Sequence, residues 1–160
     1  MAHRLVSILI ALFSIVGGAH AQDTTVRSGN PEIIAIADSY MTAYHHLDLE
    51  ALEALYDEDV VFIDPTVAGL PEVFSWTGRD RILREIAGWR TGMVRFDFQA
   101  DRIYESAGRV VYIGNVVSEV QRPNGTRKAT YPLITIVTVQ EGRIIEHRDY
   151  TDYAATRRLN

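Results

Sequence analysis

Apolar residues recur at helical spacing in three stretches of the first half of the chain. The first stretch predicts a helix over residues 31 to 46, with Asn30 as its cap and a proline at its first position. The second follows an Asp48 cap and reads LEALEALYDED, with leucines and a tyrosine on one side. The third, GRDRILREIAGW, predicts a helix from residue 79 to about residue 87.

Strand patterns dominate the rest of the sequence. VVFID predicts a short strand that stops at Pro65. Residues 66 to 76 combine glycine and proline with large apolar residues, which predicts a covering loop and not a plain connection. After Thr91, four runs predict an antiparallel meander, separated by Ser106-Ala107-Gly108, Asn124-Gly125 and Glu141-Gly142. The Asn-Gly pair predicts a two-residue hairpin turn with positive φ at both positions.

Three helices, one early strand and a four-stranded meander describe an α+β domain, since the long sheet needs helices on one face to bury it. The chain has 160 residues, with 47% hydrophobic and 23% charged content, which is typical of one globular domain. We assign this domain to residues 31–160 and expect residues 22–30 to be a flexible N-terminal segment.

The first 21 residues have a different character. They combine a basic start, an apolar run over residues 5 to 16, and the small residues Ala19 and Ala21 in an A-x-A arrangement. This pattern predicts a signal peptide over residues 1–21 and a secreted or periplasmic protein with no membrane contact after cleavage. A membrane anchor is the alternative, but the apolar run is shorter than the ~20 residues needed to span a bilayer.

Charge and residue types exclude several classes of function. Removal of the signal peptide takes away one of 16 Lys and Arg and none of the 21 Asp and Glu, and this acidic balance disfavours nucleic acid as a partner. Cysteine is absent, which excludes disulfides and thiolate metal sites. His45 and His46 precede Asp48, but adjacent helical side chains diverge by about 100°, so we predict no metal. No nucleophile elbow, phosphate-binding glycine loop or Walker-type lysine occurs.

Three segments carry a resemblance to a known family: YHHLDLEALEALYDEDVVFIDP, GRDRILREIAGW and EGRIIEHRDYTDY. With them the sequence resembles the SnoaL-like branch of the nuclear transport factor 2-like superfamily, over essentially the whole mature chain. The resemblance implies three N-terminal helices packed on a strongly curved antiparallel sheet, a cone-shaped barrel with an internal apolar pocket, and often a homodimer across the outer face of the sheet. It also implies acid–base chemistry by one or two carboxylates, with no cofactor.

In the cyclases of this superfamily the catalytic acid lies just after the last strand, in an E-x-W-x-x-x-D pattern. Glu146 and Asp152 match that pattern, while Arg148 takes the place of the tryptophan. The resemblance makes Asp152 the first candidate for a general acid and base, a role that calls for burial in an apolar cavity. The alternative is that Asp152 caps the C-terminal segment or pairs with Arg148 or Arg157.

Further candidate groups lie near the ends of two strands. His147 and Asp149 share one face of the last strand, where they would form an oriented imidazole base, or else a polar pair at the surface or in a dimer interface. The sequence leaves open which face of this strand lines the pocket. Asp64 would be a second carboxylate of the pocket, or an ordinary turn residue before Pro65.

Candidate substrate contacts come from three other elements. Tyr40 and Tyr44 lie one helical turn apart, so both hydroxyls would reach the pocket, with core packing as the alternative for at least one. Phe74 and Trp76 indicate an aromatic lid. Asn115 interrupts the apolar side of a central strand, so it is either a pocket group or a dimer contact.

These observations favour an exported protein that binds a small apolar, oxygenated molecule and acts as a cofactor-free isomerase, cyclase, dehydratase or hydrolase. Asp152 would be the general acid and base, assisted by His147 or Asp64 and by a tyrosine hydroxyl. A non-catalytic ligand-binding or dimeric assembly domain is the alternative. A catalytic Asp152 should be buried among apolar side chains with a raised pKa, whereas an Asp152 of the dimeric domain should be exposed in the monomer and paired across the dimer.

Overall fold

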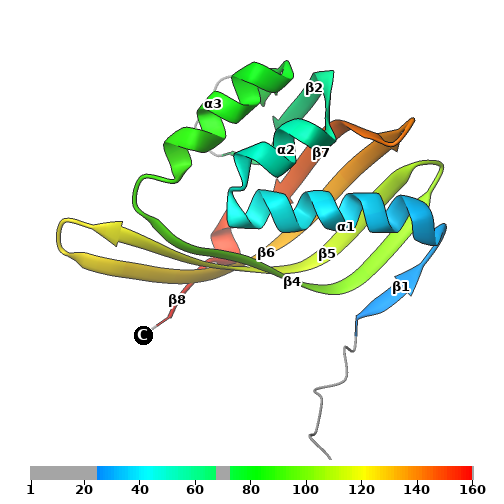
Figure 1. Cartoon of the computed structure of the whole chain (residues 1–160). Helices are drawn as coiled ribbons and strands as arrows, with labels where there is room; N and C mark the ends of the chain where they lie inside the picture. The colour runs from blue at the N-terminus through cyan, green and yellow to red at the C-terminus, as the bar shows by residue number, and fades with distance from the viewer. Residues whose placement is uncertain (1–24, 68–72, 160) are drawn as a thin grey trace, which may run out of the picture.

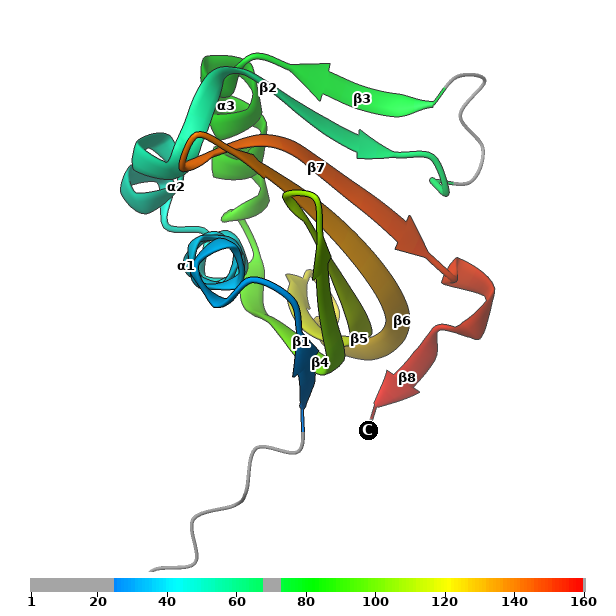
Figure 2. The same cartoon turned by 90° about the vertical axis from the view of Figure 1, so that its right-hand side faces the viewer.

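The structure is a computed structural model that describes residues 25–67 and 73–159. It consists of a long, curved sheet with helices α1, α2 and α3 on its concave side (Figures 1 and 2). The elements in chain order are β1 (Val26–Ser28), α1 (Pro31–His46), α2 (Leu49–Leu55), β2 (Tyr56–Asp64), β3 (Phe74–Thr77), α3 (Arg79–Trp89), β4 (Met93–Ser106), β5 (Arg109–Arg122), β6 (Gly125–Gln140), β7 (Arg143–Thr151), the 3-10 helix η1 (Tyr153–Ala155) and β8 (Arg157–Leu159).

The strands form one sheet in the order β1-β4-β5-β6-β7-β2-β3, with β8 paired to β6. The predicted α+β class and the packing of three helices on a curved sheet are confirmed. Two details were wrong. The sheet is mixed, because β1 pairs with β4 and β2 pairs with β7 in parallel, and it does not close into a barrel.

The predicted starts of the three helices are confirmed, whereas the predicted ends of α2 and α3 differ from the observed ones. The α1 bounds are confirmed, and the side chain of Asn30 accepts a hydrogen bond from the Glu32 backbone N–H, as a cap should. The α3 helix continues past Ala87 to Trp89. The α2 helix ends at Leu55, because Tyr56 already pairs with β7 and buries its side chain, so sheet pairing overrides the helical pattern.

Three short strands were missed, among them residues 157–159, which pair with β6 as β8. Residues 26–28 belong to the segment expected to be flexible, yet they pair with β4 as β1. Residues 74–77 belong to the predicted covering loop, yet they pair with β2 as β3, while residues 68–72 of that loop lie outside the described residues. The predicted signal peptide also lies outside them. Within the described ranges no helix is long and apolar enough to cross a membrane.

Positive φ at both central residues occurs in hairpin turns other than the predicted one. The hairpin at Asn124-Gly125 exists, but only Gly125 has positive φ, because the loop residues are Pro123 and Asn124 and proline holds φ negative. The turns with positive φ at both central residues are Ala107-Gly108 and Glu141-Gly142.

The sheet bends sharply where β4 carries a bulge opposite Gly114. The register of β4 on β5 shifts between Ala100 and Arg102, and a Cβ on Gly114 would lie 2.0 Å from the carbonyl oxygen of Gln99. Only glycine fits under such a close backbone approach. The bend curves the sheet around α1, so Gly114 helps to shape the concave side.

We predict that Gly114→Ala destabilises the protein by about 2 kcal/mol or more, because backbone must move to admit the methyl group. Gly88→Ala is the matched control: its added methyl meets open space on α3, and alanine should be neutral or stabilising by up to about 1 kcal/mol. Urea unfolding of both variants checks this. Equal stability of the two variants would contradict the role of Gly114.

One histidine of α1 is buried as a neutral ring. His45 stacks on Phe98 with ring centroids 5.7 Å apart and contacts Phe96 at 4.6 Å. Neither ring nitrogen makes a well-directed hydrogen bond with a described residue, although a weaker backbone interaction with Phe96 favours the charged ring. Burial lowers the pKa of His45 from 6.5 to about 4, partly opposed by the charge of Asp149.

Stability should therefore fall as the pH drops from about 6.5 to 4. In this range the unfolded chain binds a proton at His45 and the folded protein does not, which removes up to about 3 kcal/mol of unfolding free energy. His45→Leu should flatten this part of the pH profile of the unfolding free energy, while His46→Leu, on the exposed side of α1, should keep it. Identical profiles for wild type and His45→Leu would show that His45 is not the group responsible.

Candidate functional site

His147 and Asp149 lie on the face of β7 that points toward the helices, a question that the sequence left open. A register shift against β6 between Thr138 and Val139 leaves Ile145 unpaired and turns Ile144 inward. Beyond this bulge the strand alternates regularly, with outer side chains at Glu146 and Arg148. The buried side chains that face the helices are Ile144, His147, Asp149 and Thr151.

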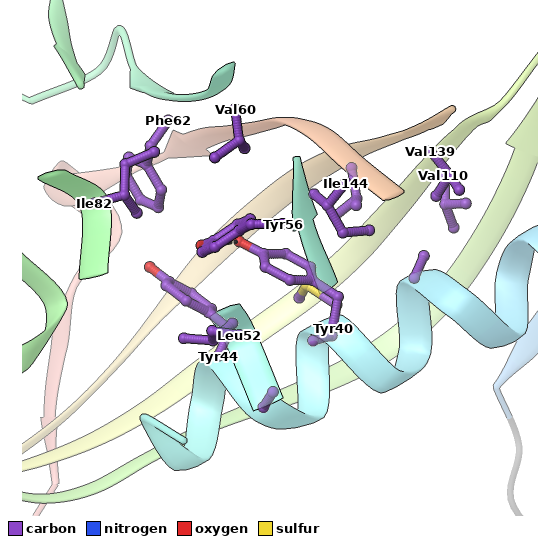
Figure 3. Close-up of a cluster of buried hydrophobic side chains, with 14 of the residues drawn as sticks. Tyr40, Tyr44, Leu52, Tyr56, Val60, Phe62, Ile82, Val110, Val139 and Ile144 are labelled. Atoms are coloured by element: carbon purple, nitrogen blue, oxygen red, sulfur yellow. Dashed lines mark hydrogen bonds between the residues drawn. The ribbon is translucent and has the colours of Figure 1, made fainter. Parts of the chain in front are cut away.

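His147 lies at the centre of the interior. Its ring is 0% exposed, and its Nδ1 lies 2.7 Å from the hydroxyl of Tyr40, which in turn lies 3.1 Å from the hydroxyl of Tyr56. Figure 3 shows the hydroxyls of Tyr40 and Tyr56 close together between α1 and the sheet. Burial raises the pKa of both tyrosines, so both keep their protons.

The proton positions follow from this chain of groups. Either direction of donation would give each hydroxyl a partner, but the carboxylate of Asp149 beside Nε2 favours a proton on that nitrogen, with Tyr56 donating to Tyr40 and Tyr40 donating to Nδ1 of His147. The remaining imidazole proton then lies on Nε2, which is 3.0 Å from Oδ2 of Asp149. The two atoms are within ion-pair distance, but no well-directed hydrogen bond joins them.

Asp149 is less completely buried than the other members of this chain of groups. Its side chain is 11% exposed, whereas that of His147 is 0% exposed. Oδ1 of Asp149 accepts a hydrogen bond of 2.6 Å from Thr135, the residue opposite it on β6. Oδ2 lies 3.0 Å from Nε2 but accepts no hydrogen bond from any described residue, so this oxygen retains lone pairs for a ligand.

Tyr44 adds a hydrogen-bond donor beside this carboxylate. Its ring centroid lies 4.8 Å from that of His147, and its hydroxyl makes no hydrogen bond with any described residue. Burial raises the pKa of Tyr44 well above its usual value of 10.0, and the charge of Asp149 raises it further. Tyr44 therefore stays protonated and can donate to an oxygen of a bound molecule.

Aromatic rings form the apolar wall of the site. Phe62 stacks on His147 with centroids 4.4 Å apart and planes within 7°. Phe74 and Trp76 contact Phe62 from β3, and Trp89 of α3 contacts it as well. Phe74 and Trp76 are thus near the predicted site, but they lie on a strand that continues the wall and not on a loop.

Asp64 is a second buried carboxylate, with both oxygens occupied. Oδ1 accepts hydrogen bonds from the backbone N–H and the hydroxyl of Thr66, and Oδ2 accepts one of 2.9 Å from the hydroxyl of Tyr153. The Thr66 hydroxyl also accepts from the backbone N–H of Thr151. Burial, followed by the bond to Asp64, raises the pKa of Tyr153 to about 12. Asp64 therefore ties the ends of β2 and β7 together.

The expectation that Asp152 is buried was wrong. Asp152 is exposed, and its carboxylate caps η1 by accepting from the backbone N–H groups of Ala154 and Ala155. Its own N–H bonds to the carbonyl of Pro132, the point on β6 where the missing proline donor interrupts pairing between β7 and β8. The capping alternative is confirmed, and we do not propose Asp152 as the acid–base group.

Asn115 does not belong to the inner site. On β5 the inward side chains are those of Val110, Tyr112 and Val116, so Asn115 points to the outer face by strand alternation. There it lines a cavity of about 420 Å³ with η1 and β6. The structure thus brings together Tyr40, Tyr44, His147 and Asp149, and it leaves out Asn115 and Asp152.

Several site residues were missed from the sequence. Tyr56 looked like part of a helix, and Thr135 looked like one polar residue in an apolar strand. Thr135 could have been found, because it occupies the inward position between Leu133 and Val137, where a hydroxyl needs a partner. No sequence pattern indicated that Tyr153 lies near the site, since its contact with Asp64 depends on the path of the chain around η1. Among the described residues, no cluster of three or more His, Cys, Asp or Glu has metal-binding geometry.

Comparisons with known proteins point to one group. A family profile described as SnoaL-like domain matches residues 37–147. A comparison with functionally curated proteins gave no match.

Solved structures share the fold. One is a protein of Shewanella denitrificans whose assignment as a SnoaL-like polyketide cyclase is provisional, with a TM-score of 0.72 and 23% identity over 79% of this chain and 94% of that one. An LEH-like epoxide hydrolase of M. tuberculosis has a TM-score of 0.65 and 18% identity over 78% and 85%. A Catenulispora acidiphila protein with a ketosteroid isomerase-like fold has a TM-score of 0.61 and 17% identity over 79% and 90%. At these identities the likeness establishes the fold.

We predict that Tyr40→Phe lowers the unfolding free energy by about 1–3 kcal/mol, because it leaves the buried Nδ1 of His147 without its donor. Tyr104→Phe is the control, since the Tyr104 side chain is exposed and should be neutral when it loses its hydroxyl. Denaturant unfolding measures both. A neutral Tyr40→Phe variant would show that the buried chain of hydroxyls does not hold His147.

Proposed function

The chain belongs to the family of SnoaL-like domains, and from this premise we propose that it is a cofactor-free acid–base enzyme acting on a small, mostly apolar molecule with a carbonyl group. One observation carries the proposal. Asp149 has an unused carboxylate oxygen and Tyr44 has an unused hydroxyl, and both residues lie against the ring of His147.

These two groups suit proton transfer at a carbon next to a carbonyl. Oδ2 of Asp149 takes the proton, the electrons of the C–H bond move to the carbonyl oxygen, and the hydroxyl of Tyr44 stabilises the resulting enolate by a hydrogen bond. Tyr44 keeps its proton, because its pKa is raised well above its usual value. The proton on Asp149 then returns to another carbon for isomerisation. In cyclisation the enolate carbon attacks a second carbonyl, and the resulting alkoxide takes the proton from Asp149.

His147 would act as a positioning residue and not as the base. It is fully buried behind Asp149 and held by Tyr40, so it cannot touch a substrate from its present position. Its Nε2, 3.0 Å from Oδ2, would orient the Asp149 carboxylate by electrostatic attraction, while Thr135 holds Oδ1 by a hydrogen bond. This reverses the roles expected from the sequence, in which Asp149 oriented a His147 base.

The fold neighbours support acid–base chemistry in general, since they include a provisional polyketide cyclase and an epoxide hydrolase. The isomerase or cyclase reading fits one free carboxylate and one phenol better than hydrolysis does, because the second carboxylate, Asp64, has both oxygens in use. Export and homodimer formation remain proposals. The outer face offers Ile134 and Tyr150, which are exposed and directly opposite each other, as a dimer contact.

The test is deuterium exchange into a panel of small cyclic and aryl ketones in D₂O, followed by NMR. The protein should speed exchange at carbons next to the carbonyl, and Asp149→Asn should lower that rate by about 10²–10⁴-fold. Tyr44→Phe should lower it as well. Asp152→Asn is the matched control and should exchange like wild type, because Asp152 caps η1 at the surface.

Two outcomes would contradict the proposal. Exchange that survives Asp149→Asn would remove Asp149 as the base. Ligands that raise the melting temperature without any exchange across the panel would favour the non-catalytic ligand-binding domain.

A further inference from the structure

Basic residues cluster at one end of the sheet of this acidic protein. The protein has a net charge of −5, yet five basic residues gather where the β5–β6 hairpin meets β8: Arg122, Arg127, Lys128, Arg157 and Arg158. Figure 1 shows this hairpin extending beyond α1 at the end of the sheet near β8. Lys128 pairs with Glu119 at 3.3 Å, whereas the four arginines make no ion pair within the described ranges.

Two of these arginines belong to the concave face. Inward positions alternate along β5 through Val116, and along β6 through Ala129, which places Arg122 and Arg127 on the same face. Arg127 is opposite Val120, so Arg122 is its diagonal neighbour across the hairpin, roughly 7–8 Å away at the backbone. Like charges this close on one face are unfavourable unless an anion lies between them.

A cavity of about 360 Å³ lies beside these arginines and extends to Tyr153, which donates a hydrogen bond to Asp64. It is lined by Ser118, Val120, Arg122, Arg127, Ala129, Tyr131, Tyr153 and Thr156. Its inner end is formed by Tyr131 and Tyr153, whose ring centroids are 6.4 Å apart, and Tyr153 donates to Asp64. Burial raises the pKa of Tyr131, and the charges of Tyr153, Asp149 and Asp64 raise it further.

We propose that Arg122 and Arg127 bind an anionic group of the substrate, a carboxylate or a phosphate, at the outer end of this cavity. This inference rests on the proposed function, because it gives a substrate class to the same site. Guanidinium groups bind both kinds of oxyanion through paired hydrogen bonds. Val120 and Ala129 lie beside them, so the part of the substrate next to the anion is apolar.

The separation along β6 between the arginines and the residue that holds Asp149 limits the length of such a substrate. Eight residues of β6 separate Arg127 from Thr135, which anchors Asp149, and an extended strand of that length spans about 26 Å. The curvature of the sheet and the reach of the arginine shorten the gap. The substrate class is therefore an elongated anion shorter than this span, with a carbonyl at the inner end and the charge at the outer end.

Calorimetric titration with three probes tests the anion site: 2-naphthoate, 2-naphthyl phosphate and the neutral 2-methoxynaphthalene. At least one anionic probe should bind about tenfold more tightly than the neutral probe. Arg122→Gln and Arg127→Gln should each weaken that anionic probe about fivefold or more and leave the neutral probe unchanged. Arg109→Gln, which removes an exposed arginine at the other end of β5, should change neither affinity. The anionic probe whose affinity the two substitutions reduce more shows whether the arginines bind a carboxylate or a phosphate.

Anionic probes that bind no better than the neutral probe, or that ignore both substitutions, would overturn the inference. The result is separable from that of the proposed function. Ketone exchange without anion selectivity would remove the arginine site and keep the acid–base site. Arginine-dependent anion binding without exchange would keep the binding site and remove the catalytic proposal. Failure of all three probes to bind would overturn the anion site outright.

Discussion

The structure depends on how a histidine is buried in the middle of the domain with a hydrogen bond at only one of its two ring nitrogens. His147 has no exposed surface, and a buried ring nitrogen without a partner would cost about 1–3 kcal/mol. Tyr40 from α1 meets one nitrogen and Asp149 from the same strand lies against the other. The helix, the last strand and the tyrosine that begins β2 are thereby fixed relative to one another.

This arrangement also explains why the two buried carboxylates differ. Asp64 is saturated by Thr66 and Tyr153, so it joins strand ends. Asp149 is held on one oxygen by Thr135, and the other oxygen faces a ring that offers no well-directed bond. A carboxylate of the second kind is held in position and still has lone pairs for a reaction, which is what an acid–base group needs. Burial alone does not distinguish the two residues, whereas the count of hydrogen bonds does.

The sequence predicted the helices, the meander and the family, because these depend on periodicity and on capping residues such as Asn30 and Asp48. It also placed Tyr40, Tyr44, His147 and Asp149 among the candidates. It failed where long-range pairing decides. Tyr56 follows a helical pattern but pairs with β7, and Asp152 matches a family pattern but caps η1 because Pro132 interrupts the pairing beside it. The roles within the His147–Asp149 pair depend on burial, which differs between two residues on the same face of one strand.

The most direct test of this account is the protonation of His147, measured by ¹⁵N NMR of the imidazole nitrogens in uniformly labelled protein at neutral pH. The hydrogen-bond chain predicts an Nδ1 without a proton, accepting from Tyr40, and a protonated Nε2 facing Asp149. Tyr40→Phe should perturb the Nδ1 resonance. A protonated Nδ1, or a ring that exchanges rapidly with solvent, would contradict the claim that His147 is a buried group holding Asp149 in place.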